Sequence, residues 1–360
     1  MSTLKTKLKR LESFLLPSRI GYLIFYVTNR CNFRCDFCFY FDEIEKGRKP
    51  DELTVEEIRR LAPNIGPLLQ LSLTGGEPFL RKELAEITKI ILDHTRAMRV
   101  TVPTNASLTD RAVAYLEEIL PLYPDTFFRI AFSIEGIGED HDELRSMPGS
   151  YKKIQESYAE ISPFRERFDN FALECNSVFS ANSEETMIST IKHLSEEFRF
   201  DNISVTYARG AIKDPELKRV SHQRYREVNA FIEGLEKKKK KGLLFPAVRG
   251  IAEVTRDIMM RTEFNDEFVT PCLAGRKLVV ISETGDVQPC EILGKTMGNL
   301  RDRDFRLHDI LAEPKNQELL KWIKESKCKC TFECALAANV AWHPSLYPNV
   351  LLSTLRNIGK

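Results

Sequence analysis

VTNRCNFRCDFCFY, residues 27–40, is the stretch from which the fold and the chemistry of this chain can be read. It places three cysteines on one short segment with the spacing C-x3-C-x2-C, namely Cys31, Cys35 and Cys38. The apolar run at 22–27 precedes them and predicts a buried β-strand. Polar residues end that run, so the thiols are expected on a loop at the strand's carboxyl end. Parallel α/β folds place their chemistry at that end.

Three thiolates on one loop suit three irons of a cubane iron–sulfur cluster, which normally takes four cysteines. The next cysteine in the chain is Cys175, so one iron would be open to a ligand that is not a protein side chain. Zinc is the alternative, although a structural zinc site takes four protein ligands and no neighbouring histidine completes the set. A disulfide is not expected, because the other features of the chain are those of an intracellular protein.

Composition narrows the function classes. The net charge of this 360-residue chain is +1, which argues against an electrostatic grip on nucleic acid. No apolar run is long enough for a membrane span, and basic residues interrupt the N-terminal segment, so it is not typical of a signal peptide. The nine cysteines gather in two main groups, as metal ligands do. We expect a cytoplasmic protein.

Strands alternate with helices along the first two thirds of the chain, which predicts βαβ units and a parallel sheet. The expected strands are 22–27, 69–73, 99–102, 127–133, 171–179 and 203–207, and the expected helices 55–61, 82–94, 109–120 and 183–198. Residues 211–262 are expected to be helical and charged, with Lys237 to Lys241 as a solvated helix end. Leucines recur at helical spacing within 3–16, with basic residues between them. This is typical of a helix packed on the fold, and it leaves open a contact with a membrane surface.

The cysteine loop, with Phe37 before its last cysteine, resembles the signature of the radical S-adenosylmethionine (SAM) superfamily. The resemblance implies an α/β fold with a partial (β/α)6 TIM-like barrel. It also implies a 4Fe-4S cluster whose open iron is chelated by SAM. Reductive cleavage of SAM would release a 5′-deoxyadenosyl radical that abstracts hydrogen from a substrate, with flavodoxin or ferredoxin as the reductant.

The resemblance also assigns roles to residues at the strand ends. Paired glycines let a ligand approach the backbone closely, and the Gly-Gly-Glu-Pro motif at 75–78 is expected to meet the SAM amino group. Glu135 stands where the family often has aspartate, and a carboxylate there can bind ribose hydroxyls. Asn105, Arg145 and Asn176 fall where members of the family contact the ribose, the carboxylate or the sulfonium of SAM. The alternatives are turn formation for Asn105, a surface ion pair for Arg145 and a strand-end backbone bond for Asn176. The implied SAM-binding residues are Phe37, Gly75, Gly76, Glu77, Pro78, Asn105, Ser133, Glu135, Arg145 and Asn176.

A second group of cysteines lies near the C-terminus. Two of them flank a predicted β-hairpin at 277–287, and the spacing C-x12-G-x4-C followed by C-x-C-x3-C resembles the SPASM/twitch extension of radical SAM enzymes. The full SPASM pattern has more cysteines, so we expect one auxiliary 4Fe-4S cluster. Its ligands would be Cys272, Cys290, Cys334 and either Cys330 or Cys328. A structural zinc site is the alternative.

Glu291 directly follows Cys290. In anaerobic sulfatase-maturating enzymes, which share this extension, an acidic residue follows the matching cysteine and acts as a base. Glu291 is therefore a candidate catalytic acid or base. The alternative is a residue on the hairpin surface or one that supports the cluster, because the sequence does not show whether a carboxylate reaches a proton.

Three segments are expected: an N-terminal helix at 1–20, a radical SAM core at 21–262 and a small α+β SPASM/twitch-like domain at 263–360. We expect a small metabolite, sugar or lipid-linked substrate, with oxidation or epimerisation as the net change. Peptide modification is the first alternative. It ranks below a small substrate because the residues before Tyr22 are too few for a peptide-recognition domain. A non-catalytic iron–sulfur or zinc electron carrier is the second, and it would leave the strand-end motifs unexplained.

Overall fold

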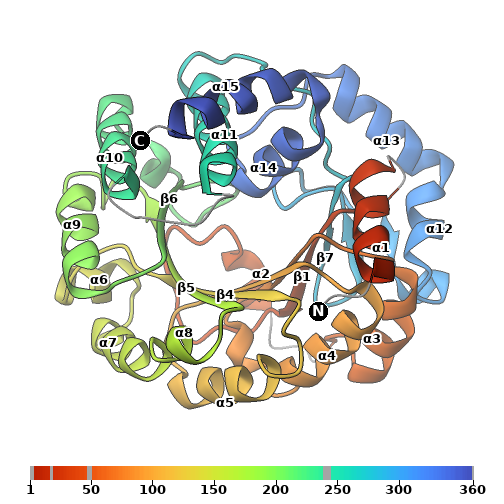
Figure 1. The fold of residues 1–360 in the computed structure, drawn as a ribbon, viewed down its shortest axis with the longest axis horizontal. Helices are drawn as coiled ribbons and strands as arrows, with labels where there is room; N and C mark the ends of the chain where they lie inside the picture. Colours follow the sequence, from red (N-terminus) through yellow and green to blue (C-terminus); the bar gives the residue numbers. More distant parts are fainter. Residues whose placement is uncertain (1–3, 17–18, 47–50, 238–244, 359–360) are drawn as a thin grey trace.

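The computed structural model describes residues 4–16, 19–46, 51–237 and 245–358 (Figure 1). Six parallel strands form a curved sheet in the order β6-β5-β4-β3-β2-β1, with helices around its outer face. The strands are β1 (Tyr22–Thr28), β2 (Gln70–Gly75), β3 (Arg99–Thr104), β4 (Phe127–Ser133), β5 (Phe171–Phe179) and β6 (Asn202–Tyr207). The predicted partial (β/α)6 barrel is confirmed.

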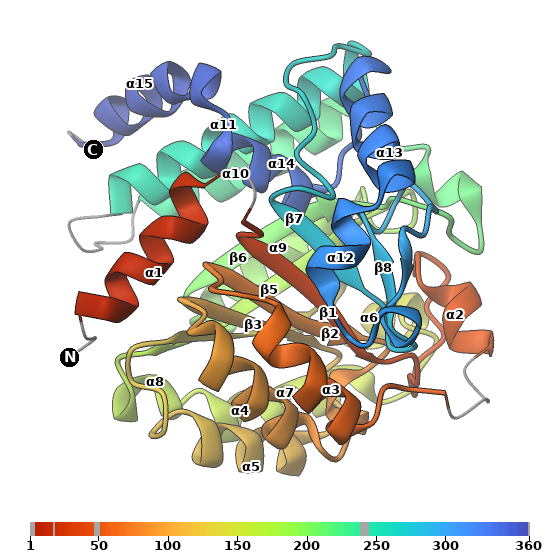
Figure 2. The same ribbon diagram turned by 90° about the vertical axis from the view of Figure 1, so that its right-hand side faces the viewer.

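Helices connect the strands, and most of them cover the outer face of the sheet, whereas the first lies near the carboxyl ends of the strands (Figure 2). They are α2 (Phe41–Lys46), α3 (Val55–Leu61), α4 (Leu84–Thr95), α5 (Thr109–Ile119), α6 (Glu139–Leu144), α7 (Ser150–Ile161), α8 (Phe164–Arg167) and α9 (Met187–Glu197). Helix α3 begins with a capping box, in which the Thr54 hydroxyl accepts from the Glu57 N–H and the Glu57 carboxylate accepts from the Thr54 N–H. Helix α4 turns Ile87 and Ile91 into the core at helical spacing.

Strand β1 is buried along its whole length. It pairs in parallel with β2 on one side and with β7 (Leu278–Ile281) on the other, so neither of its edges meets solvent. Burial on both faces and both edges explains why its sequence is a continuous apolar run without alternation. The cysteine loop therefore starts from one of the most constrained strands of the molecule.

The C-terminal region continues the barrel sheet (Figure 2). The predicted hairpin is present as β7 and β8 (Asp286–Gln288), and β9 (Gly298–Asn299) pairs with β8. Strand β7 pairs with β1, with Tyr22 opposite Leu278. The sequence did not indicate this pairing, because β1 and β7 are far apart in the chain and an edge carries no local signal of its partner. The sheet thus has nine strands.

The remaining helices are α1 (Leu4–Leu15), α10 (His222–Lys237), α11 (Phe245–Phe264), α12 (Leu307–Ala312), α13 (Pro314–Glu325), α14 (Glu333–Trp342) and α15 (Tyr347–Ile358). Lys277 holds the end of α1, since its Nζ donates to the carbonyls of Ser13 and Leu16 at 3.0 and 2.7 Å. Burial lowers the pKa of Lys277 to about 8. Residues 1–3 and most of the predicted solvated helix end, Lys238 to Lys241, lie outside the described residues. None of the described helices combines the length and the apolar character that crossing a bilayer requires.

Candidate active site

The cysteine loop leaves β1 at the carboxyl end of the barrel. Cys35 is buried, and Cys31 and Cys38 are half-buried, in an apolar cluster that includes Phe33 and Phe37. Burial is the main cause that raises the pKa of Cys31 to about 12 and that of Cys38 to about 11. The neighbouring thiols raise both pKa values further. Such thiols become thiolates when a metal displaces their protons.

No three His, Cys, Asp or Glu side chains within the described ranges converge on a site the size of one ion. A cubane cluster distributes its thiolates over separate irons, whereas zinc gathers four ligands about one point. Three thiols on one loop match a cluster that keeps one iron free of protein ligands, as the sequence predicts.

The glycines after β2 pack against the cysteine loop. The Gly76 N–H donates to the Thr28 carbonyl at 3.0 Å. A Cβ on Gly76 would lie 2.3 Å from the Arg30 carbonyl oxygen and 2.8 Å from the Cys31 Cβ. A Cβ on Gly75, whose φ is +153°, would lie 2.1 Å from the Thr28 carbonyl oxygen. The two glycines are thus required for the loop to approach β2 this closely.

Glu77 is buried at the same place and is fixed by hydrogen bonds. Its carboxylate accepts from the N–H groups of Phe79 and Asn105, at 3.2 and 2.8 Å, and from the Thr104 hydroxyl at 2.8 Å. Burial is the larger cause and raises the pKa of Glu77 to about 7 despite these donors. A carboxylate offers about four acceptor positions, so three donors leave one for a ligand.

Asn105 ties the end of β3 to the cysteine loop. Its Nδ2 donates to the Asn32 Oδ1 at 2.9 Å, and its Oδ1 accepts from the N–H and the hydroxyl of Ser107. The Asn32 Nδ2 in turn donates to the Ser107 hydroxyl. The predicted ribose contact of Asn105 stays a prediction, and in this structure its side chain is occupied by the loop.

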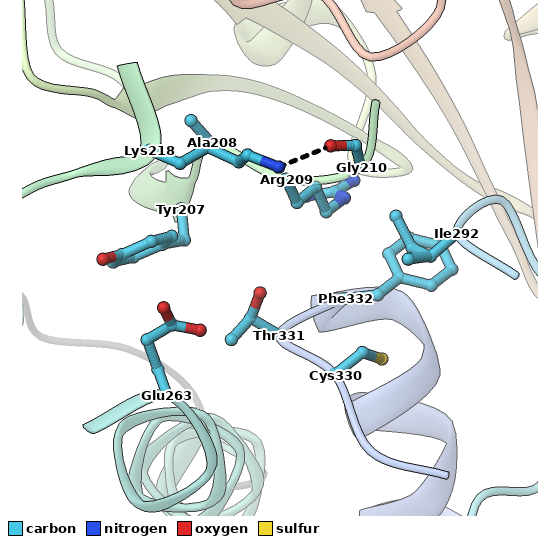
Figure 3. A pocket seen from close by; sticks show the side chains of 10 residues that line it. All are labelled: Tyr207, Ala208, Arg209, Gly210, Lys218, Glu263, Ile292, Cys330, Thr331 and Phe332. Atoms are coloured by element: carbon cyan, nitrogen blue, oxygen red, sulfur yellow. Dashed lines mark hydrogen bonds between the residues drawn. The ribbon is translucent and has the colours of Figure 1, made fainter. Parts of the chain in front are cut away.

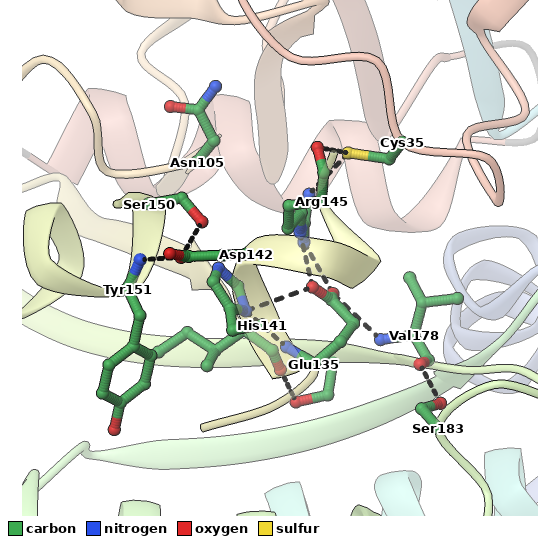
Figure 4. A network of polar contacts seen from close by, with 12 residues as sticks. Cys35, Asn105, Glu135, His141, Asp142, Arg145, Ser150, Tyr151, Val178 and Ser183 are labelled. Atoms are coloured by element: carbon green, nitrogen blue, oxygen red, sulfur yellow. Dashed lines mark hydrogen bonds and ion pairs between the residues drawn. The ribbon is translucent and has the colours of Figure 1, made fainter. Parts of the chain in front are cut away.

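A buried ion pair lies beside Cys35 (Figure 4). Arg145 donates to both oxygens of Glu135, at 2.5 and 2.6 Å, and its Nη1 donates to the Cys35 sulfur at 3.7 Å. The guanidinium lies over the ring of Phe37, 5.2 Å from its centre. Burial raises the pKa of Glu135, and Arg145 opposes that shift. The structure therefore brings four predicted site residues into one contact group, with a positive charge next to a cluster thiol.

Ser133 and Asn176 lie in register on neighbouring strands. Asn176 is also opposite Ser204 of β6, and its Oδ1 accepts from the Ser204 hydroxyl at 2.5 Å. These residues form a polar row across β4, β5 and β6. Their predicted contacts with SAM stay predictions.

The second cysteine group comes together at the C-terminal region. Burial is the main cause that raises the pKa of Cys330 to about 12, and the neighbouring thiols of Cys272, Cys290 and Cys328 contribute to the rise. Cys334 has other neighbours, since its sulfur accepts from the Tyr22 hydroxyl at 3.3 Å. The structure thus groups Cys272, Cys290, Cys328 and Cys330 and sets Cys334 beside β1, and the ligand set remains a prediction. Cys175 is fully buried in β5.

Glu291 is not on the hairpin surface. Its Oε1 accepts from the Tyr26 hydroxyl at 2.7 Å, and its Oε2 lies 3.7 Å from Arg209. Arg209 also pairs with Glu333 at 2.5 Å and lies between the rings of Phe39 and Phe332. This Arg209 cluster, consisting of Arg209, Glu291 and Glu333, joins the tip of β6 to the C-terminal region. Arg209 and Glu333 were not among the predicted site residues. The position of Arg209 just after a strand was the signal that could have indicated it.

A cavity of about 300 Å³ adjoins the Arg209 cluster (Figure 3). Arg209 and Gly210 line it from the tip of β6, and Cys330 and Phe332 line it from the C-terminal region. Lys218 and Glu263 lie on opposite sides of it (Figure 3). The cavity therefore lies between the barrel and the second cysteine group.

Comparison with known families identifies both regions. The profile of the radical SAM superfamily matches residues 25–162, and that of the SPASM iron–sulfur cluster-binding domain matches residues 272–335. The chain belongs to the radical SAM superfamily. Its C-terminal region carries a SPASM domain.

Relatives of this radical SAM protein share parts of its sequence. A GTP 3′,8-cyclase from Microcystis aeruginosa (strain NIES-843 / IAM M-2473) is 36% identical over 126 residues, which are 31% of this chain and 38% of that protein. A GTP 3′,8-cyclase from Peptoclostridium acidaminophilum is 29% identical over 144 residues, 39% of this chain and 42% of that protein. The chain thus spans less than half the length of these relatives.

Solved structures share the radical SAM fold. SuiB from Streptococcus suis bound to S-adenosylmethionine aligns with a TM-score of 0.59 at 17% identity, over 85% of this chain and 68% of that one. The enzyme anSMEcpe with bound AdoMet aligns with a TM-score of 0.60 at 15% identity, over 94% of each chain. Similarity at this level of identity establishes the fold.

The radical SAM core fits the family's cofactors, which are SAM and 4Fe-4S clusters, one of them auxiliary. The loop thiols are grouped and the glycines hold the loop against β2, while Glu77 keeps one acceptor position. Around the second group, burial raises the pKa of Cys290, and hydrogen bonds from the N–H groups of Ile292 and Leu293 oppose that shift. Hydrogen bonds to the sulfurs are a feature of cluster sites.

We predict that Gly76→Ala prevents the radical SAM cluster from assembling. The added methyl group would collide with the Arg30 carbonyl, which is backbone and cannot move without displacing Cys31. Iron per chain after anaerobic reconstitution should fall to about half, because the auxiliary cluster keeps its own ligands. Gly234→Ala in α10 is the matched control, since no atom lies within 4 Å of its added Cβ. Full iron content in Gly76→Ala would contradict the packing role.

Proposed function

We propose that this protein is a radical SAM enzyme that abstracts a hydrogen atom from a small, water-soluble metabolite or sugar. When bound, the cluster and SAM supply the 5′-deoxyadenosyl radical. Cys31, Cys35 and Cys38 would hold the cluster, and Phe37, Gly75, Gly76, Glu77, Pro78, Asn105, Ser133, Glu135, Arg145 and Asn176 are the residues we propose around SAM. The residues of the chain orient the reactants and exclude water.

The cavity next to the Arg209 cluster is the main observation that supports a small-molecule substrate. Its volume of about 300 Å³ is at the lower end for small-molecule sites. The relatives named for a reaction on GTP also act on a small molecule. Because Cys330 lines the cavity, an auxiliary cluster at the second cysteine group would border the substrate, as a net oxidation requires.

The Arg209 cluster supplies the polar recognition. It holds two carboxylates and one guanidinium, so it carries one more negative than positive charge when all three are ionised. Among the described residues, Glu291 Oε2 and Glu333 Oε1 are buried without a hydrogen-bond partner. Buried acceptors without donors are costly. Arg209 is the member of the cluster that lines the cavity, so a substrate hydroxyl or ammonium would have to pass Arg209 to reach the two carboxylates. We therefore propose Glu291 as the proton acceptor and Arg209 with Glu333 as the groups that position it.

The test uses anaerobically reconstituted protein reduced with dithionite, flavodoxin or ferredoxin. We expect conversion of SAM to 5′-deoxyadenosine and about eight irons per chain, as two four-iron clusters require. Deuterated sugars and hydroxylated or amino metabolites should then transfer deuterium to 5′-deoxyadenosine. Intact SAM after reduction of iron-replete protein would contradict the proposed activity. A content of about four irons and one zinc per chain would instead indicate a zinc site in place of the auxiliary cluster.

A further inference from the structure

Helix α15 is packed with its polar side inward. Its only buried residues are Ser353 and Asn357. Both donate to the Glu253 carboxylate of α11, Asn357 at 3.1 Å. The opposite side of the helix carries Leu351, Leu352, Leu355 and Ile358, each more than half exposed. A surface helix normally turns its apolar stripe to the core. This helix does the reverse, so its orientation does not arise from burial of its own leucines.

The contact with α11 holds this orientation firmly. A Cβ on Gly250 of α11 would lie 2.5 Å from the Thr354 hydroxyl, so only glycine lets the two helices approach so closely. Two hydrogen bonds to one half-buried carboxylate then fix the rotation of α15 about its axis. Turning the leucines inward would break those bonds. The exposed leucine face is therefore built into the fold.

Exposed apolar side chains concentrate at one end of the molecule. Among the described residues, every large exposed hydrophobic side chain except Trp322 lies on α1 or just after it, on α11 or α15, in the turns that lead into β3 and β4, or at the first residue of β4. Helices α1 and α15 both project at the end where the strands begin (Figure 2). On α1 the exposed residues are Leu11 and Leu15, with Leu16 just after the helix. Two separate apolar helices at one end suit a broad surface better than a single groove.

Charge identifies the kind of surface. The sequence of α15 has no acidic residue, and Arg356 is exposed beside Leu352 and Leu355. The sequence of α1 carries Lys5, Lys7 and Lys9 against one acidic residue, Glu12. Helices with leucines on one side and basic residues beside them bind anionic lipid surfaces. The same charges would repel a second copy of this chain.

We propose that α15 and α1 dock this protein on the surface of an anionic lipid bilayer. The leucines of α15 enter the boundary between headgroups and acyl chains, while Arg356 meets the headgroups. The cysteine loop lies at the opposite end of the strands, so docking leaves the active site open to water. This arrangement agrees with a water-soluble substrate and not with a lipid held in the same bilayer, although docking does not depend on the proposed function.

The test is co-sedimentation of the full chain with vesicles. We expect binding to phosphatidylcholine vesicles that contain phosphatidylglycerol, weaker binding at high salt, and little binding to phosphatidylcholine alone. The double variant Leu351→Gln/Leu355→Gln should reduce the bound fraction at least tenfold. A second double variant, Leu352→Gln/Ile358→Gln, should do the same. Trp322→Gln is the control, because Trp322 is exposed on α13, away from this end, and its loss should leave binding unchanged.

Circular dichroism and thermal unfolding show whether each variant is folded, and every residue substituted in the two double variants is more than half exposed. No binding to anionic vesicles would overturn the proposal, as would unchanged binding by both folded double variants. Sedimentation without lipid gives a further outcome. A dimer that the α15 variants dissociate and Trp322→Gln does not would make a second copy of this chain the occupant and would overturn lipid docking.

Discussion

Replacing Cys35 by alanine is expected to lower reductive SAM cleavage by more than about a thousandfold, which corresponds to about 4 kcal/mol of barrier. The loop supplies three thiols, and a cubane that loses one of them has no replacement nearby, because the next cysteine is Cys175 in β5. Cys35 is buried against Arg145 and Phe37, so no other side chain can take its place. The measurement is the rate of 5′-deoxyadenosine formation by reduced, reconstituted protein.

Cys175→Ala is the matched control. Cys175 is as buried as Cys35, its sulfur lies 3.9 Å from the Ser177 hydroxyl, and it behaves as a small apolar residue. We expect Cys175→Ala to keep the wild-type rate and iron content, so a general effect of removing a buried thiol is separated from loss of the cluster. Wild-type SAM cleavage by Cys35→Ala would refute the assignment of the loop.

Replacing Arg145 by methionine is expected to lower the free energy of unfolding of the metal-free protein by about 3–5 kcal/mol. Methionine keeps most of the side-chain length, while Glu135 loses both of its charged hydrogen bonds and stays buried. The pKa of Glu135 is already raised by burial and would rise further without Arg145. The loss of stability should therefore be largest at high pH and shrink as the pH falls and Glu135 takes up a proton. Urea unfolding at several pH values measures it.

The double variant Glu135→Gln/Arg145→Met separates folding from ligand binding. It removes both charges, so most of the lost stability should return. SAM binding should not return if Arg145 contacts the SAM carboxylate as predicted. Lys89→Ala breaks an exposed pair with Glu118 and should cost at most about 1 kcal/mol. A loss of that size in Arg145→Met would show that the pair is not buried in solution.

Local patterns in the sequence were sufficient for the barrel. Each of the six strands was predicted within about two residues of its position. The signal was a continuous apolar run at β1, which is buried on both faces, and an alternation of buried and half-buried residues at β3 and β6. The cysteine spacing identified the cluster loop for a similar reason, as thiolates on one loop need only local geometry. Phe37, Glu135 and Arg145 were predicted from the resemblance to the radical SAM superfamily, and the structure brings them together at Cys35.

The partners of other side chains depend on contacts between parts of the chain that are far apart in sequence. The sequence by itself determined the parallel strands and the cluster loop, because these follow from hydrophobic period and ligand spacing within short windows, and its resemblance to the radical SAM superfamily implied the barrel and the cofactor class. Only the tertiary structure decided that β7 pairs with β1, that Arg209 joins Glu291 to Glu333, and that α15 turns its leucines outward. Pairing, ion-pair partners and helix orientation are set by side chains many residues away, and neither a spacing nor a period records which of them will meet.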